Sequence, residues 1–402
     1  MLSFSDFPFR DAETFPFSGS VLRYLEDFCE HFKISRFMRF GCTVVRVAQR
    51  GEKWRVEHTT RDGAGESTDF DFVIICSGLQ SSPAIPDLPG LKDFKGKLMH
   101  SSEYKSNNEF TGKRVLVVGG SYSGAEIAAQ ISQVTKSYLS IRRSHYLIPR
   151  FCSTPEFQNV PFDFLFFRRK STIGTPTEEN IEGHEFLESI CGDASQVHPL
   201  LATDKSVPPL PNINDTLLDA VKEKRVELFS RLKGIEGNLA VFEDNSIVEV
   251  DVILFATGYT LELPFMDDSM KRTIKYDSRD LTQPVILYES TFHPELKNLA
   301  FVGIFNGTLP GSIEMQSHWV CSVFSGKTQL SLEEMLVGLK KEESIRAVPY
   351  ENRSQLPDYV DRIDNYARRA QLYPSQELIN ITGKPVTSAN YNQYHWKTCH
   401  FC

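Results

Sequence analysis

The sequence predicts an α/β fold built around a parallel sheet, and two observations carry this prediction. Residues 114–128, RVLVVGGSYSGAEIA, run from an apolar strand through a glycine-rich turn into a helix, and a further strand follows at 138–141. Two segments also echo each other, since residues 71–78 read DFVIICSG and residues 251–258 read DVILFATG. A buried strand that ends at a glycine lets the backbone approach a ligand at the carboxyl edge of a sheet. At 402 residues, the chain suits two domains, or one domain inserted into another.

Composition and charge exclude several classes of protein. The formal net charge of −8 argues against broad binding to nucleic acid or to anionic membranes. No stretch approaches 18 consecutive apolar residues, so we expect no transmembrane helix. The first residues, MLSFSDFPFR, lack the basic and apolar regions of a signal peptide, and eight cysteines without framework spacing favour reduced thiols. We expect a cytoplasmic protein, with peripheral association with the endoplasmic reticulum as an open alternative; a homo-oligomer is compatible with the sequence.

The elements before the glycine-rich turn follow from periodicity. Residues 20–33 carry apolar side chains on one helical face, with Ser20 as the N-cap. Strands are expected at 43–47, at 54–58 and at 70–75, and the proline-rich residues 81–90 form a connection.

The elements after the turn form a strand–helix–strand unit and then an excursion. We expect a strand at 115–118, a helix at 124–136 and a strand at 138–141. Residues 150–235 are irregular with helical patches such as LLDAVKEKRVELF, and the sheet resumes at 250–255. A last helix is expected near 332–341, with Ser331 and Glu334 as a capping box.

The glycine-rich turn has the composition of a loop that binds the pyrophosphate of a dinucleotide. Gly119 makes the tight turn and Gly124 permits close packing of helix on strand, while Ser121 stands where a second glycine is usual. A helix N-terminus binds phosphate through its free N–H groups and its dipole. The predicted cofactor-binding residues of this loop are Gly119, Gly120, Ser121, Tyr122, Ser123 and Gly124.

The end of the second strand indicates which dinucleotide binds. A site for NAD places an acidic residue about 20 residues after the loop, to accept from the ribose 2′-hydroxyl. Here Arg142 and Arg143 stand at that place, in SIRRSHY. A guanidinium binds a 2′-phosphate through charge-assisted hydrogen bonds, so the pair predicts NADPH. The alternative is a solvated basic turn.

No side-chain constellation for catalysis or metal binding is found. HExxH, paired cysteines with zinc spacing, a Walker lysine and a G-x-S-x-G elbow are all absent from the sequence. His100 is a candidate general base, but an isolated histidine with no orienting partner is more often structural. We therefore predict that a cofactor carries the chemistry.

Several motifs, in order along the chain, resemble the flavin-containing monooxygenase family. The pattern F-x-G-x-x-x-H-x-x-x-Y/F is matched by Phe94, Gly96, His100 and Tyr104. Baeyer–Villiger monooxygenases have a similar pattern, usually with Trp at the last position. Further matches are FSDFPF at 4–9, the arginine pair, FATGY at 255–259, and E-x-Q-x-x-W at 314–319.

The resemblance implies a two-dinucleotide flavoprotein with an NADPH domain inserted into an FAD domain. We expect FAD-domain parts at residues 1–108 and 259–402, and the NADPH domain at 109–258 with an irregular insertion at about 150–235. By family analogy, NADPH reduces the flavin, O2 forms a C4a-hydroperoxide, and a soft nucleophilic N or S atom of a small molecule is oxygenated, as in N,N-dimethylaniline monooxygenases. The residues expected to contact the flavin are Ser77, Gly78, Thr257, Gly258 and Gln316. For Gln316, a buried structural glutamine is the alternative.

The sequence departs from the family pattern at its N-terminal side. Family members begin with a strand and a GxGxxG loop for the ADP half of FAD, whereas the first fifty residues here contain only Gly19 and Gly41. We therefore expect an incomplete FAD domain. The alternatives are a truncated, catalytically weak NADP(H)-binding form, or a Baeyer–Villiger or N-hydroxylating relative. A disulfide reductase is disfavoured because no CxxC lies near a predicted flavin edge.

Overall fold

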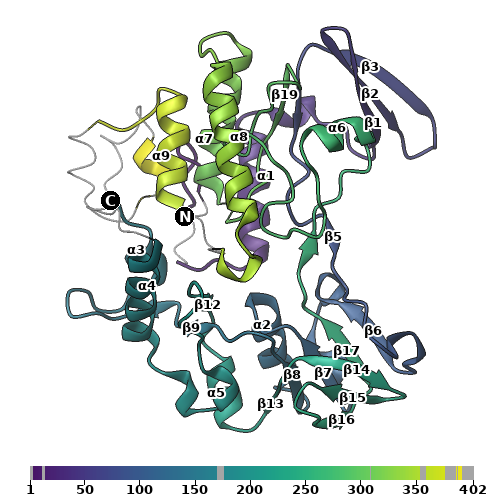
Figure 1. The fold of residues 1–402 in the computed structure, drawn as a ribbon, viewed down its shortest axis with the longest axis vertical. Coiled ribbons are helices and arrows are strands. Elements are labelled where there is room, and N and C mark those ends of the chain that lie inside the picture. Colours follow the sequence, from purple (N-terminus) through teal and green to yellow (C-terminus); the bar gives the residue numbers. More distant parts are fainter. Residues whose placement is uncertain are drawn as a thin grey trace.

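The computed structural model shows two lobes joined by short connections (Figure 1). It describes residues 3–10, 14–169, 176–307, 309–353, 359–375, 386 and 388–391. The lower lobe in Figure 1 is built on a parallel sheet, and the upper lobe gathers most of the long helices. The expected α/β class is confirmed.

The lower lobe contains a five-stranded sheet of order β13-β8-β7-β17-β6. All four strand pairings are parallel. Its strands are β6 (Lys97–His100), β7 (Val115–Val118), β8 (Ser137–Ser140), β13 (Val226–Phe229) and β17 (Val252–Phe255). Every residue of β7 and β17 is buried, which is expected where continuous apolar runs form central strands covered on both faces.

Different elements cover the two faces of this sheet. Val115 and Val117 pack with Ile127 and Ile131 of helix α2 (Tyr122–Ile131). Leu116 and Val118 point the other way and pack with residues of an antiparallel meander. The meander consists of β14 (Leu232–Glu236), β15 (Leu239–Phe242) and β16 (Ile247–Glu249).

The excursion between β8 and β13 is more regular than the sequence indicated. It contains β9 (Tyr146–Ile148), β10 (Phe151–Cys152), β11 (Val160–Pro161), α3 (Phe162–Phe166), α4 (Pro176–Cys191), β12 (Pro211–Ile213) and α5 (Leu217–Lys222). The expectation of one helical patch in LLDAVKEKRVELF is wrong for its second half. Lys224 has a φ of 58°, which ends the helical path, and the following VELF is the edge strand β13.

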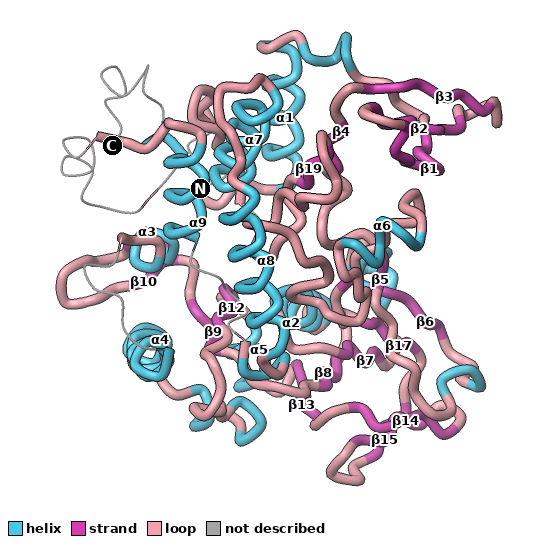
Figure 2. Tube along the Cα trace, turned by 45° about the horizontal axis from the view of Figure 1, so that its top comes forward, coloured by secondary structure: helices cyan, strands magenta, loops and turns pink. Residues whose placement is uncertain are grey.

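The upper lobe packs helices around two buried aromatic side chains, Trp319 and Tyr366. Its helices are α1 (Ser18–His31), α6 (Asp268–Thr273), α7 (Pro310–Phe324), α8 (Leu332–Ala347) and α9 (Tyr359–Arg369). Figure 2 shows the antiparallel β1 (Thr43–Arg50), β2 (Lys53–Thr59) and β3 (Gly65–Phe70) projecting at one end of this lobe. The strands expected at 43–47 and 54–58 and the helices near 20–33 and 332–341 are confirmed, with shifted ends. The expected N-cap at Ser20 is wrong, because α1 begins at Ser18 and its N-cap residue is Phe17.

One expected strand divides into two. Residues 65–70 form β3, whereas β4 (Val73–Ile75) pairs in parallel with β19 (Leu299–Phe301) in a separate sheet. Helix α2 is also shorter than expected, because it ends at Ile131 in a series of turns. Ser331 accepts a hydrogen bond from the backbone N–H of Glu334 at 3.3 Å, as an N-cap does.

Two extended segments lie side by side where the lobes join. β5 (Ser82–Pro83) pairs in antiparallel fashion with β18 (Tyr259–Thr260). The parallel sheet of the lower lobe includes β6, so that lobe takes up residues on the N-terminal side of the expected boundary at 109. Lys97–His100 pairs with β17 along its whole length.

In the part of the chain that the structure describes, none of the helices is both long and apolar enough to cross a membrane.

Candidate functional site

The glycine-rich turn lies between β7 and α2, at the carboxyl edge of the five-stranded sheet. Gly119 has a φ of +114°, and a Cβ there would lie 2.4 Å from the carbonyl oxygen of Ala256. A Cβ on Gly124 would lie 1.7 Å from the carbonyl oxygen of Gly119. Both contacts are with backbone, which cannot move aside, so only glycine fits at these two positions. The steric roles predicted for the two glycines are confirmed.

The start of α2 leaves polar groups available to an anion. Ser121 is the N-cap residue, and its exposed side chain makes no capping hydrogen bond. The first helical bond of this turn runs from the N–H of Ala125 to the carbonyl of Ser121, at 2.9 Å. The N–H groups of residues 122–124 precede it, and such groups have no partner within a helix. Together with the helix dipole, they fit a phosphate group.

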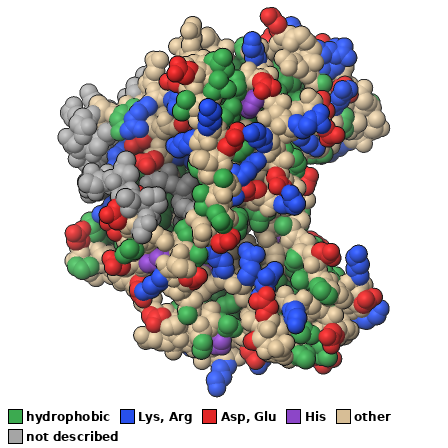
Figure 3. Space-filling model, viewed as in Figure 1, with side chains coloured by type: hydrophobic (Ala, Val, Ile, Leu, Met, Phe, Trp, Pro, Cys, Tyr) green, Lys and Arg blue, Asp and Glu red, His purple; other side chains and the backbone are tan. Residues whose placement is uncertain are grey.

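Arg142 and Arg143 follow β8 after one intervening residue, Ile141, and line one cavity of about 300 Å³. Arg142 is exposed, and no partner is found for its guanidinium among the described residues. Arg143 is partly buried and donates from Nη2 to the carbonyl oxygen of Glu351, 3.4 Å away. Figure 3 shows Lys and Arg side chains gathered where the lower lobe faces the upper lobe.

The structure adds an acidic residue that the sequence did not place here. Asp204 lines the same cavity as the arginine pair. Its carboxylate accepts from the N–H and the Oγ of Ser206, at 2.9 and 2.6 Å. These hydrogen bonds lower the pKa of Asp204, so the carboxylate is charged but already occupied. The arginines outnumber it, and the cavity keeps a positive balance.

The motif formed by Phe94, Gly96, His100 and Tyr104 supports the elements next to the glycine-rich turn. A Cβ on Gly96 would lie 2.3 Å from the carbonyl oxygen of Asp251, so this glycine lets β6 approach β17. Phe94 is buried in the cluster beneath the sheet. The hydroxyl of Tyr104 donates to Gln130 Oε1 on α2, at 3.0 Å.

His100 is buried and both of its ring nitrogens are engaged. Nδ1 accepts from the backbone N–H of Ser102 at 3.2 Å, which leaves the proton on Nε2. Nε2 lies 3.0 Å from the carbonyl oxygen of Gly258, to which it therefore donates. With 1% of its surface exposed, His100 holds the backbone at Gly258 and has no free nitrogen to act as a base.

The two echoing segments have the same geometry. β4 ends at Ile75 and β17 ends at Phe255, and in each case a glycine with positive φ follows three residues later. Gly78 has a φ of +75° and Gly258 one of +85°, with open space where a Cβ would stand. Ser77 and Thr257 precede them, and Thr257 donates from Oγ1 to the carbonyl of Ala84. Both turns thus present backbone to open space, as a ligand contact requires.

Gln316 uses its whole amide group inside the protein. Oε1 accepts from the N–H of Gly303 at 2.9 Å, and Nε2 donates to Thr291 Oγ1 at 2.8 Å. The side chain is fully buried. This favours the structural interpretation of Gln316, whose influence on a bound flavin would act through the position of Gly303.

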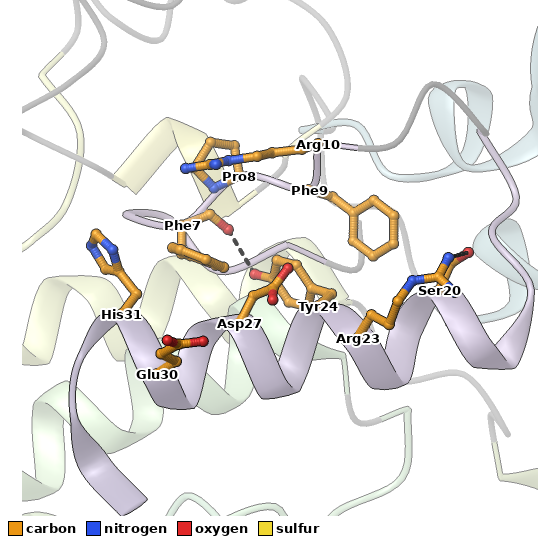
Figure 4. A pocket seen from close by; sticks show the side chains of 10 residues that line it. All are labelled: Phe7, Pro8, Phe9, Arg10, Ser20, Arg23, Tyr24, Asp27, Glu30 and His31. Atoms are coloured by element: carbon orange, nitrogen blue, oxygen red, sulfur yellow. Dashed lines mark hydrogen bonds between the residues drawn. The ribbon is translucent and has the colours of Figure 1, made fainter.

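The N-terminal segment lies along α1 and is held by hydrogen bonds to α1 and to α7. Figure 4 shows the segment from Phe7 to Arg10 above one face of α1, and the two enclose a cavity of about 420 Å³. The hydroxyl of Tyr24 donates to the carbonyl oxygen of Phe7 at 2.7 Å and accepts from the N–H of Phe4 at 2.8 Å. Ser5 donates to the carboxylate of Glu314 on α7. Two of the recognised motifs, FSDFPF and E-x-Q-x-x-W, therefore contact each other.

Besides Asp204, a second residue of the site, Asn212, escaped the sequence-based prediction, and Asn214 supports α2 behind it. Asn212 on β12 donates from Nδ2 to the carbonyl oxygen of Gly120 at 3.3 Å. Asn214 donates from Nδ2 to Glu126 Oε2 on α2 at 3.2 Å. No motif pointed to them, because Asn212 stands 92 residues from the turn and reaches it only through the pairing of β12 with β9.

Comparison with known proteins identifies the family of this chain. The model of the family described as FMO-like, flavin-binding monooxygenase-like, matches residues 1–387. The chain belongs to the flavin-binding monooxygenase-like family. FAD and NADPH are the cofactors of this family, so the chain is an enzyme of the flavoprotein monooxygenase class.

Individual relatives agree with this assignment. Flavin-containing monooxygenase 5 of Rattus norvegicus is 29% identical over 93% of this chain and 72% of its own length. Dimethylaniline monooxygenase [N-oxide-forming] 2 of Mus musculus is 30% identical over 91% of this chain and 70% of its own length.

Solved structures show the same fold. S-allyl-L-cysteine S-oxygenase from Allium sativum superposes with a TM-score of 0.63 at 24% identity, covering 94% of this chain and 74% of its own. Closed cyclohexanone monooxygenase gives a TM-score of 0.62 at 19% identity, covering 92% of this chain and 85% of its own. The two-lobed architecture is therefore that of flavoprotein monooxygenases with two dinucleotide-binding domains.

Proposed function

We propose that this flavin-binding monooxygenase-like chain uses NADPH, held on the turn at Gly119–Gly124, to oxygenate soft N or S atoms of small molecules. The observation that carries the proposal is the pairing of a glycine-only phosphate turn with Arg142 and Arg143 at the end of the neighbouring strand. The pyrophosphate would accept hydrogen bonds from the first N–H groups of α2. The ribose 2′-phosphate would meet the arginines, with Arg142 as the main ligand because its guanidinium is exposed.

The other site residues hold backbone in place. His100 fixes Gly258, and Tyr104 fixes α2 through Gln130, so the motif couples the turn to the connection between the lobes. Gly78 and Gly258 would let backbone approach the bound cofactors. When bound, FAD would supply the redox chemistry by which electrons from NADPH reduce O2, so that one oxygen atom enters the substrate and the other leaves as water. No side chain of this chain is assigned an acid or base role in that chemistry.

The residues that would hold FAD fit its two halves unequally. Gly78, Gly303 and the N-terminus of α7 lie beyond the carboxyl ends of β4 and β19, where a flavin can contact backbone. Among the described residues, the only glycine turn between a parallel strand and a helix with this cradle geometry is that of β7 and α2. The ADP half of FAD therefore finds no second cradle of this kind in the part of the chain that the structure shows.

The substrate class follows from the relatives. One relative is an N-oxide-forming dimethylaniline monooxygenase, and one structural neighbour is an S-oxygenase of S-allyl-L-cysteine. Cyclohexanone monooxygenase has the same fold and supports a Baeyer–Villiger activity as the second candidate. We favour oxygenation of N or S because the last position of the shared motif here is Tyr104.

The test is a product analysis with the purified chain, supplied with FAD, NADPH and O2. A thioether, a tertiary amine and a cyclic ketone are offered separately, and NADPH consumption is compared with product formed. Formation of sulfoxide or N-oxide, without lactone, is expected. Lactone as the sole product would replace the proposal by the Baeyer–Villiger alternative. Binding of NADPH without product from any substrate would leave only an NADP(H)-binding role.

A further inference from the structure

Asn212 has an unusual position for a polar side chain. It is fully buried, on the short strand β12 that pairs in parallel with β9, with Asn212 opposite Leu147. Its Nδ2 donates to the carbonyl oxygen of Gly120, and its Oδ1 finds no partner among the described residues. A buried amide with one unpaired oxygen is costly, so its single hydrogen bond is the feature that calls for an explanation.

That hydrogen bond determines the direction of an N–H group in the phosphate turn. In a trans peptide, the carbonyl of one residue and the N–H of the next point in opposite directions. The carbonyl of Gly120 points inward to Asn212, so the N–H of Ser121 points away from Asn212. Glycine has wide freedom in φ and ψ, so the plane between residues 120 and 121 needs an external restraint. If the plane flipped, a carbonyl oxygen would take the place of the N–H and repel a phosphate.

We propose that Asn212 is a positioning residue for the cofactor pyrophosphate. By holding the Gly120 carbonyl inward, it keeps the Ser121 N–H turned toward the anion at the start of α2. The inference rests on the proposed binding of NADPH at this turn. It assigns a function to the excursion between β8 and β13, because Asn212 is supplied by that excursion.

The chain offers a matched control two residues along. Asn214 directly follows β12, and its Nδ2 contacts Glu126 rather than the turn. Its Oδ1 accepts from the N–H groups of Thr216 and Leu217, at 3.0 and 2.7 Å, at the start of α5. Replacing Asn214 therefore disturbs the same excursion and leaves Gly120 restrained.

The experiment measures the dissociation constants of NADPH and of 2′-AMP for the whole chain by calorimetry. NADPH uses both the phosphate turn and the arginines, whereas 2′-AMP carries the 2′-phosphate and no pyrophosphate. Asn212→Leu should raise the dissociation constant of NADPH by about tenfold or more. It should change the dissociation constant of 2′-AMP by no more than about twofold. Arg142→Ala should weaken both ligands. Asn214→Ala should lower the thermal midpoint and leave both dissociation constants unchanged.

Asn212→Ala covers the case in which the leucine variant does not fold. Its smaller side chain leaves room for a water molecule to donate to Gly120, so NADPH should bind with intermediate affinity. Unchanged NADPH affinity in both Asn212 variants would overturn the inference, and so would an equal loss for NADPH and 2′-AMP, which indicates collapse of the whole site. If the unmodified chain bound 2′-AMP and NADPH equally weakly, or if Arg142→Ala had no effect, the proposed function itself would fail.

Discussion

Replacing Glu314 by Gln should remove a large part of the pH dependence of stability. The Glu314 carboxylate lies on α7 and accepts from the N–H of Ser5 at 2.9 Å and from its Oγ at 2.6 Å. Burial raises the pKa of Glu314 to about 7; the hydrogen bonds from Ser5 oppose this rise, and the nearby charge of Asp6 adds to it. A glutamine has nearly the same shape, keeps an acceptor for Ser5, and carries no charge.

The sign and size of the effect follow from the pKa. The folded protein holds the proton of Glu314 more tightly than the unfolded chain, whose carboxyl has a pKa of 4.5. The stability that Glu314 contributes is therefore greatest below pH 4.5, falls as the pH rises to about 7, and is level above that. At about 1.36 kcal/mol per pKa unit, the difference between 4.5 and about 7 corresponds to at most about 3 kcal/mol.

The assay is urea unfolding of both proteins at pH 5 and pH 8. The Glu314→Gln variant should be the more stable protein at pH 8, and its free energy of unfolding should change less between the two pH values. His318 lies one turn along α7, and burial lowers its pKa. Its contribution is common to both proteins and cancels in the comparison. The same pH dependence in both would refute the buried, protonated state of Glu314.

Two further predictions concern the dinucleotide-binding lobe. Arg142→Ala should weaken the binding free energy of NADPH by about 1.5–3 kcal/mol and leave that of NADH nearly unchanged. Both are measured by calorimetry, and equal losses for the two cofactors would contradict the assignment. Arg143→Ala should cost less, because Arg143 already donates to the carbonyl of Glu351. Gly96→Ala should lower the free energy of unfolding by about 1–3 kcal/mol, because its Cβ would lie 2.3 Å from the carbonyl oxygen of Asp251. Gly65→Ala is the control, because a Cβ at residue 65 meets no atom within 4 Å. Equal free energies of unfolding for the two variants would argue against the close approach of β6 to β17.

Features fixed by local sequence were the ones that could be predicted. The strand at Val115–Val118, the steric need for Gly119 and Gly124, and the glycine turns that follow β4 and β17 all depend on residues close together in the chain. Such features combine hydrophobic pattern with turn chemistry, and tertiary packing only reinforces them.

Features that depend on distant pairing could not be predicted. VELF at 226–229 continues a helical pattern, but it forms a strand because β8 offers an edge to pair with. Lys97–His100 joins the sheet of the lower lobe only through β17, more than a hundred residues later. Asn212 and Asp204 reach the site through the excursion, whose path is set by packing, so no spacing rule identifies them.

The sheet of the upper lobe leads to a prediction about flavin retention. Among the described residues, β4 pairs only with β19, and Phe72 and Ile74 are 44% and 41% exposed. The run DFVIICSG is typical of a strand buried on both faces of a larger parallel sheet. An apolar strand with an open edge favours association between molecules, and a sheet with an open edge beside Gly78 anchors a ligand weakly.

We therefore expect the 402-residue chain to bind NADPH but to retain FAD in less than stoichiometric amount after purification. The phosphate cradle at β7 and α2 is assigned to NADPH, and the described residues offer no second glycine turn of this kind to the ADP half of FAD. The measurement is the ratio of flavin absorbance to protein after gel filtration. Ile74→Lys, which places a charge on the open strand, should reduce concentration-dependent association without raising the flavin content. Stoichiometric FAD that survives gel filtration would show that the described residues suffice to anchor the whole cofactor, and that the open edge of β4 does not limit it.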